Sequence, residues 1–356
     1  MRTFSCSVCG SLLIFENSVC VTCGTPQGFF LPQLDVLAVP RDGSLVPCAN
    51  LTVAGCSWLV TEPGGLCLSC RLTRTRPADD DLAGMASYAR TEAEKRRLIY
   101  QLVDLNLPVV AADDDPHGLA FDLLSSAREK VITGHADGVV TIDLAEGEDP
   151  HREAMRVQMG EAYRTMLGHL RHETGHYYQQ VLVDGMSPQS GWSSTVSGHR
   201  PWVAQAASSE RYVELFGDPS ADYGEALARH YEQGAPPDWR TSFVSEYATA
   251  HPFEDWAETF AHYLHITDTL QSAAAYGVSV EGPGLPVARA GVLEAEPVDE
   301  VASLGNGQEI VDRWLPISYA LNAMSRSMGN DDLYPFVLSR PVIEKLCFVH
   351  DLIAGT

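Results

Sequence analysis

The sequence has little of three things: long apolar runs, positive charge and export signals. No apolar stretch approaches the roughly 18 residues that a transmembrane helix needs. Only 24 Lys and Arg stand against 47 Asp and Glu, a formal net charge of −23, whereas surfaces that bind nucleic acid or anionic membranes need clustered cations. The N-terminal residues, MRTFSCSVCG, lack the basic and then apolar layout of a signal peptide. These absences argue against membrane insertion, nucleic-acid binding and export, and we expect a cytoplasmic protein.

The first four of the nine cysteines form two C-x-x-C-G pairs. In such a pair two thiolates can bind one metal ion, and the following glycine can adopt the positive φ that turns backbone N–H groups toward sulfur. Two pairs together predict a closed, tetrahedral zinc site of the ribbon type. The alternative, a disulfide framework, needs an oxidising compartment, for which no export signal is present. The predicted ligands of this structural zinc are Cys6, Cys9, Cys20 and Cys23.

The next four cysteines combine one C-x-x-C pair with two cysteines from further upstream. They predict a second structural zinc, because a module of this size needs metal to supply stability that its core cannot. The predicted ligands are Cys48, Cys56, Cys67 and Cys70. In the alternative, the first two are small buried hydrophobes and only the C-x-x-C pair is special. Cys347 stands in an apolar run, where we expect a packed thiol with a raised pKa.

The stretch RHETGHYY at 171–178 contains the H-E-x-x-H pattern of zinc hydrolases. On a helix, His172 and His176 share one face with Cβ atoms about 5–6 Å apart, so both imidazoles can bind one zinc ion. Glu173 lies beside that face, where a glutamate can take a proton from the attacking water. Apolar residues recur at helical spacing upstream of the motif, and Asp149 is a candidate N-cap. The alternative is a solvated helix face that carries two histidines.

Two histidines leave a catalytic zinc one protein ligand short. The metzincin continuation requires glycine at 179 and histidine at 182, and the sequence has Gln179 and Leu182 there. A glutamate on a later helix is the other common solution, with an acidic residue one turn on that accepts a hydrogen bond from a ligating histidine. In the helix predicted at 252–266, Glu254 and Glu258 occupy those positions. The alternative is that both are solvated helix charges.

Other stretches predict what surrounds these sites. We expect an amphipathic helix at 84–106, a β-hairpin at 129–145, short helices near 202–216 and 221–233, and helices with apolar faces at 309–356. Within the hairpin, 139–144 is our candidate for an edge strand that pairs with an extended substrate backbone, although a strand that merely covers the helix fits as well. The basic run RLTRTR at 71–76 is interpreted as a solvated linker or docking edge.

These motifs resemble a known family. The cysteine-rich N-terminus, RHETGHYY, HPFEDWAETFAHYLHITD, LNAMSRSMG and YPFVL together resemble a bacterial family of zinc-ribbon proteins with a zinc metallopeptidase domain. The 247–268 stretch also resembles the zinc-binding helix of the anthrax lethal-factor protease, a gluzincin. That resemblance implies zinc ligation by Glu254, a supporting role for Glu258 and an oxyanion-binding role for Tyr247. It does not extend through 177–246, so substrate specificity does not carry over.

We therefore predict zinc-dependent hydrolysis of peptide bonds, with one catalytic and one or two structural zinc ions. The catalytic zinc is assigned to His172, His176 and Glu254, with Glu173 as the base and Tyr247 as the donor to the developing oxyanion. Other candidate donors are Tyr177, His199 and His251, while His169, His262 and His265 are expected to be supporting or surface residues. Two alternatives stay open. One is a zinc-stabilised protein that binds a partner without cleaving it, with the cysteine module as docking surface, and the other is hydrolysis of a non-peptide amide.

The predicted fold class is α+β, in a chain of 356 residues that is long enough for one large domain and a small one. Residues 1–76 are predicted to form a small β-rich zinc-binding module, with the ribbon at 1–30 and the second cysteine quartet at 31–76. Residues 77–356 are predicted to form a mainly helical, zincin-like metallopeptidase domain that contains a small β-sheet and ends in a helical cap.

Overall fold

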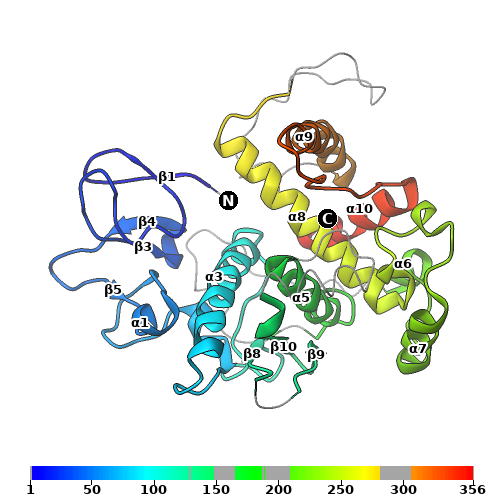
Figure 1. The fold of residues 1–356 in the computed structure, drawn as a ribbon, viewed down its shortest axis with the longest axis horizontal. Coiled ribbons are helices and arrows are strands. Elements are labelled where there is room, and N and C mark those ends of the chain that lie inside the picture. The colour runs from blue at the N-terminus through cyan, green and yellow to red at the C-terminus, as the bar shows by residue number, and fades with distance from the viewer. Residues whose placement is uncertain are drawn as a thin grey trace. The chain divides into compact units, whose positions relative to one another are not determined.

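The computed structural model describes residues 2–127, 130–147, 165–186, 188, 209–280 and 306–355 (Figure 1). The chain divides into two compact units. The first comprises Met1–Arg152 with Met186–Val203, and the second comprises Glu153–Gly185 with Ala204–Thr356. Among the described residues, no helix combines the length and the apolar character needed to cross a bilayer.

The first unit begins with three small antiparallel hairpins and two short helices. The strand pairs are β1 (Phe4–Ser5) with β2 (Leu12–Leu13), β3 (Gln27–Phe30) with β4 (Asp35–Ala38), and β5 (Val46–Pro47) with β6 (Leu59–Val60). A 3-10 turn, η1 (Leu31–Gln33), joins β3 to β4, and α1 (Leu51–Ala54) and α2 (Leu68–Arg71) flank β6 in sequence. Strands this short bury little surface, so aromatic side chains dominate their core.

An aromatic cluster joins these hairpins to the long helix α3 (Leu82–Asp104). Phe29 packs against Phe15 with ring centroids 4.9 Å apart and against Trp58 at the same distance, and Tyr100 of α3 lies 5.0 Å from Phe15. All four rings are fully buried. The amphipathic helix predicted at 84–106 is thus confirmed, shifted by two residues toward the N-terminus, where Asp81 caps it by accepting a hydrogen bond from the Gly84 N–H.

A four-stranded sheet completes the first unit, in the order β7-β8-β10-β9. Its strands are β7 (Thr73–Thr75), β8 (Ala120–Leu124), β9 (Gly134–Ala136) and β10 (Val139–Asp143), followed by the 3-10 turn η2 (Leu144–Gly147). The predicted hairpin is confirmed, because β9 and β10 pair antiparallel. Asp137 and Gly138 between them both have positive φ, at 48° and 79°, as a two-residue hairpin turn requires.

The structure corrects two predictions here. The prediction of an edge strand at 139–144 is wrong, because β10 lies between β8 and β9 and pairs with both. Along Val139–Thr141 its backbone therefore has no open side for a substrate. The interpretation of 71–76 as a linker is also wrong, because Thr73–Thr75 form strand β7, which pairs parallel with β8. Strand β7 lies at an edge of the sheet, so the other interpretation, a docking edge, stays a prediction. The charges of the basic run are neutralised locally: Arg71 is 2.7 Å from Asp114 and Arg76 is 2.7 Å from Asp79, and Arg74 pairs with Asp122.

The second unit is helical. Its elements are α5 (Met166–Leu182), α6 (Ser209–Phe216), α7 (Tyr223–Gln233), the 3-10 turns η4 (Trp239–Thr241) and η5 (Tyr247–Thr249), α8 (Pro252–Ala275), α9 (Gly307–Ser327) and α10 (Arg340–Ala354). Helices α5 and α8 lie against each other, with the Trp256 indole N–H donating to the Gly175 carbonyl at 2.8 Å. Trp256 and Phe260 are fully buried. With helices here and small sheets in the first unit, the α+β class is confirmed.

The helix boundaries follow from capping. Thr165 caps α5 by accepting from the Gly168 N–H at 3.0 Å, and the expected start near Asp149 lies outside the described residues. The helix predicted at 221–233 is confirmed as α7, and α6 is the described part of the one predicted at 202–216. The predicted C-terminal helices are α9 and α10. Cys347 is half-buried in α10, where burial raises the pKa of its thiol to about 11.

Candidate metal centres

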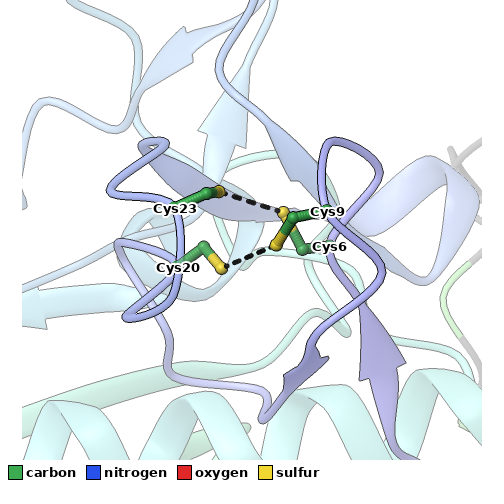
Figure 2. A group of neighbouring side chains, drawn as sticks. All are labelled: Cys6, Cys9, Cys20 and Cys23. Carbon is green, nitrogen blue, oxygen red and sulfur yellow. Dashed lines mark hydrogen bonds between the residues drawn. The ribbon is translucent and has the colours of Figure 1, made fainter.

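The first four cysteines converge on one point. Sγ of Cys6 lies 3.8 Å from Sγ of Cys23, and Sγ of Cys9 lies 3.6 Å from Sγ of Cys20 (Figure 2). A tetrahedral zinc with Zn–S bonds of about 2.3 Å places its sulfurs about 3.8 Å apart, so the spacing fits zinc. None of the nine cysteines forms a disulfide, which rules out the disulfide framework in this structure.

The local backbone geometry of the two C-x-x-C-G pairs forms this site. Gly10 and Gly24 both adopt positive φ, at 74° and 70°, and each donates its N–H to the carbonyl of the first cysteine of its own pair at 2.8 Å. Each C-x-x-C-G pair thus closes a tight turn that presents two sulfurs on one side, and Figure 2 shows the two turns facing each other. The side chain of Gln27 donates to Cys6 Sγ at 3.4 Å, a contact that orients a ligand from outside the coordination sphere.

The second cysteine quartet is equally compact and more deeply buried. The four sulfurs of Cys48, Cys56, Cys67 and Cys70 all lie within 4.8 Å of one another, and each residue is at most 4% exposed. Sγ of Cys56 is 3.6 Å from Sγ of Cys67, and the Cys67 N–H donates to Cys48 Sγ at 3.3 Å. The structure therefore has two four-cysteine clusters that could each hold a metal ion, and the upstream cysteines Cys48 and Cys56 belong to the second one.

The H-E-x-x-H motif lies on α5 and its histidines face α8. Nε2 of His172 is 3.0 Å and Nε2 of His176 is 3.6 Å from Oε2 of Glu254. Two bonds of about 2.0–2.1 Å at the tetrahedral angle place ligand atoms about 3.3 Å apart, and the two distances bracket that value. Two imidazoles and one carboxylate form one of the known donor sets of catalytic zinc sites. The residues present thus fit a zinc ion in both chemistry and spacing.

Glu258 lies one helical turn beyond Glu254 and reaches the other nitrogen of the same imidazole. Its Oε1 is 2.6 Å from His172 Nδ1. A carboxylate at this nitrogen fixes the tautomer with the proton on Nδ1, which leaves the lone pair of Nε2 for a metal. Burial alone would raise the pKa of Glu258, but the hydrogen bond from His172, together with the charges of His172 and His262 and a hydrogen bond from Ser245, outweighs it and lowers this pKa to about 2.

Glu173 is 6% exposed, and its carboxylate faces His169 one turn earlier on α5. Nε2 of His169 is 3.1 Å from Oε1 of Glu173. Burial raises the pKa of Glu173, and the contact with His169 together with the charges of His172 and His176 more than offsets that effect, so the net shift is downward. Glu173 is therefore a carboxylate near neutral pH. His169, expected as a supporting or surface residue, supports this glutamate.

Tyrosines border the same group of side chains. The ring of Tyr247, in η5, lies 5.9 Å from the His172 ring. Burial and the nearby charge of Glu254 raise the pKa of its phenol, so the proton stays in place. Sequence reasoning did not find Tyr223, the first residue of α7, whose phenol donates to Oε1 of Glu254 at 2.5 Å. The capping residue Asp222 predicts where α7 begins, but no local signal predicts which helix lies beside it.

The remaining candidates have structural contacts. Tyr177 is 2% exposed and packs against Tyr178. His251 caps α8: its Nδ1 accepts from the Phe253 N–H at 3.1 Å, and its Nε2 donates to the Ala221 carbonyl at 3.2 Å. His262 is hydrogen-bonded to the Tyr334 hydroxyl at 2.8 Å, and the ring of His265 stacks on the same tyrosine. His199 lies outside the described residues.

Comparisons with known proteins cover nearly all of the chain. A family model described as "Putative zinc-binding metallo-peptidase" matches residues 84–196 and 195–352, and a zinc-ribbon domain model matches residues 3–81. Among relatives, the chain is 49% identical to proteins of Mycobacterium bovis and Mycobacterium tuberculosis that are named as uncharacterized, in alignments that cover 99% of this chain and 95% of each relative. No solved structure matches the chain.

Proposed function

Since the chain belongs to the family described as "Putative zinc-binding metallo-peptidase", we propose that it is a zinc-dependent peptidase that hydrolyses peptide bonds in peptide or protein substrates. One observation carries the proposal: ligand atoms of His172, His176 and Glu254 lie within 4.8 Å of one another, and Glu173 is buried on α5, the helix of the two histidines. A site that only stabilised the fold would need no base beside an incomplete ligand set, whereas a catalytic zinc needs three protein ligands and an open position.

In the proposed reaction, zinc and the side chains of the protein have different roles. Zinc, when bound, lowers the pKa of water toward 7 and polarises a carbonyl. Glu173 takes the proton from the attacking water, because its depressed pKa keeps it ionised and available as a base. It then delivers that proton to the leaving amine. His169 at 3.1 Å holds the carboxylate in one orientation through both transfers.

Two further side chains complete the proposed site. Glu258 accepts the Nδ1 proton of His172 at 2.6 Å and so presents the other nitrogen as a ligand. Tyr247 retains its proton and is the proposed donor to the oxyanion that develops on the scissile carbonyl. Removal of one such donor costs roughly 3–4 kcal/mol of transition-state stabilisation in other hydrolases.

We further propose that the zinc-binding module 1–76 has a structural role and that 77–356 is the peptidase domain. The first module has two hairpins of only two residues per strand, so its fold depends on the two cysteine-bound zinc ions rather than on hydrogen-bonded sheet. Binding of structural zinc is a large part of the folding free energy in small modules of this kind.

The decisive experiment compares Glu173→Gln with the wild type. Glutamine keeps the shape of the side chain but cannot act as a base, so cleavage of casein or a peptide library should fall at least about 100-fold, while elemental analysis finds an unchanged zinc content. Glu232→Gln, the same change at an exposed position on α7, serves as the matched control and should keep full activity.

The competing outcomes are distinct. Wild-type protein with all its zinc that cleaves no member of a broad peptide library would refute the peptidase assignment and favour a binding protein. Cleavage by Glu173→Gln at the wild-type rate would instead remove Glu173 from the role of base. Activity that survives in both variants and resists chelation would identify a contaminating protease.

A further inference from the structure

The two oxygens of Glu254 have different partners. Oε2 faces the ring nitrogens of His172 and His176 at 3.0 and 3.6 Å, whereas Oε1 accepts a hydrogen bond of 2.5 Å from the phenol of Tyr223. Glu254 is 1% exposed, so water does not compete for either oxygen. Tyr223 therefore distinguishes two oxygens that are chemically equivalent in an isolated carboxylate.

The position of Tyr223 is fixed by contacts other than this hydrogen bond. It is the first residue of α7, whose N-terminus is capped by Asp222 accepting from the Glu225 N–H at 2.8 Å. Its ring lies 5.3 Å from the His251 ring and 6.5 Å from the Phe253 ring, at the start of α8. The loss of the phenol oxygen alone would leave these contacts intact, so the ring is held in place independently of Glu254.

We infer that Tyr223 is a positioning residue that keeps Glu254 a one-oxygen ligand of the catalytic metal, an inference that rests on the proposed function. A carboxylate can bind zinc through one oxygen or chelate it through both. A catalytic site with three protein ligands must keep a coordination position open for water or substrate, and chelation by Glu254 would fill it. The phenol occupies the second oxygen and so favours the open geometry.

The test uses full-length protein from which mild chelation has removed the third metal while the four-cysteine sites keep their zinc. Cobalt(II) is then titrated into wild type, Tyr223→Phe and Tyr231→Phe. Tyr231 lies on the same helix and is 62% exposed, so its variant controls for the chemical change. Absence of thiolate-to-cobalt charge-transfer absorption verifies that the cysteine sites have not exchanged.

We expect cobalt affinity to fall about 10–100-fold in Tyr223→Phe, the usual effect of removing a hydrogen bond to a metal ligand. The visible d–d absorption should also weaken, because a chelating Glu254 raises the coordination number above four. Tyr231→Phe should match the wild type in both measurements. A Tyr223→Phe protein with wild-type affinity and an unchanged spectrum would overturn the inference while leaving the proposed function intact.

Different results would contradict the proposed function. Wild-type protein that binds no cobalt ion beside the two cysteine-held zinc ions would overturn both the metal centre and the role of Tyr223. Wild-type protein that binds cobalt but cleaves no peptide would refute the peptidase assignment, while the affinity and spectrum of Tyr223→Phe would still decide whether the tyrosine orients Glu254.

Discussion

Gly175, inside the H-E-x-x-H motif, sets how closely the two metal-binding helices approach. A Cβ at this position would lie 3.1 Å from Cα and 3.2 Å from the carbonyl oxygen of Ala257, and 3.4 Å from Cβ of Phe260. All three atoms are fixed to the backbone of α8 and cannot rotate away. Gly175→Ala therefore forces α5 and α8 apart by a few tenths of an ångström at the point where their side chains meet the metal.

The magnitude follows from two opposed effects. Alanine is favoured over glycine in a helix interior by about 1 kcal/mol, whereas added volume in a well-packed core costs typically about 1–3 kcal/mol. The shift also strains the hydrogen bond of 2.8 Å from the Trp256 indole to the Gly175 carbonyl, and a bond of this kind contributes about 1 kcal/mol. We expect a net loss of about 1–2 kcal/mol in the free energy of unfolding, together with weaker binding of the catalytic zinc.

Urea denaturation of protein without the third metal gives the stability change free of metal linkage, and competition with a chelator gives the zinc affinity. Two other glycines provide a graded series. A Cβ on Gly224 would meet only Asp222 Oδ1 at 3.4 Å, whereas one on Gly307 would lie 2.5 Å from the Cys347 Cα. Gly224→Ala should be neutral or stabilising, and Gly307→Ala should lose more stability than Gly175→Ala yet keep the affinity of the metal site.

Two results for Gly175→Ala would contradict this expectation. If Gly175→Ala stabilises the protein as Gly224→Ala does, the α5–α8 interface is looser than these distances indicate. If it loses stability but binds zinc as tightly as the wild type, the separation of these two helices does not control the geometry of the metal site.

Three further predictions concern the metal sites and the core. Mild chelation should remove a third zinc ion and leave the two held by cysteines, as elemental analysis would show; retention of only one would contradict the second four-cysteine site. Glu254→Ala should release the third zinc, whereas Glu258→Ala should lower its affinity about 10–100-fold; the reverse order in a chelator competition would mean that the ligand is misassigned. Lys345→Met should cost about 3–5 kcal/mol in urea denaturation, because it leaves the buried Asp255, 2.6 Å away, without its partner; Arg340→Met, on the surface of the same helix, should change little.

Residue spacing within single elements predicted most of the metal centres. The C-x-x-C-G pairs close their turns through Gly10 and Gly24 over a few residues, so the ribbon geometry is local. The positions of Glu254 and Glu258 on one face of α8 follow from the helical period alone. In these cases a short stretch of sequence specifies the local backbone geometry. Only the packing of one such stretch against the other, turn against turn or α5 against α8, had to be assumed.

The errors and omissions involve pairing between distant segments. Strand β7 was interpreted as a solvated linker or docking edge because RLTRTR is a basic run, and its partner β8 lies beyond the whole of α3. The two parallel strands and the helix form a β-α-β unit, a pattern that the strand-like AFDLL after a long helix could have indicated. Strand β10 was taken as a candidate edge strand for substrate pairing, and its partner β8 was not recognised. Tyr223 was missed because its role depends on where α7 meets α8.

His172 explains why one helix interface can determine the whole candidate site. Two carboxylates four residues apart on α8 reach its two ring nitrogens, Glu254 at Nε2 and Glu258 at Nδ1. Residues at this spacing have Cβ atoms about 5–6 Å apart, so both contacts can form only if α8 crosses α5 at one height and one distance. Gly175 permits that distance, and the bond from Trp256 to its carbonyl fixes the height. The residue types inside H-E-x-x-H and E-D-W-A-E thus specify the packing of the two helices as well as the proposed chemistry, and substitutions that preserve every ligand can still weaken the metal site through this interface.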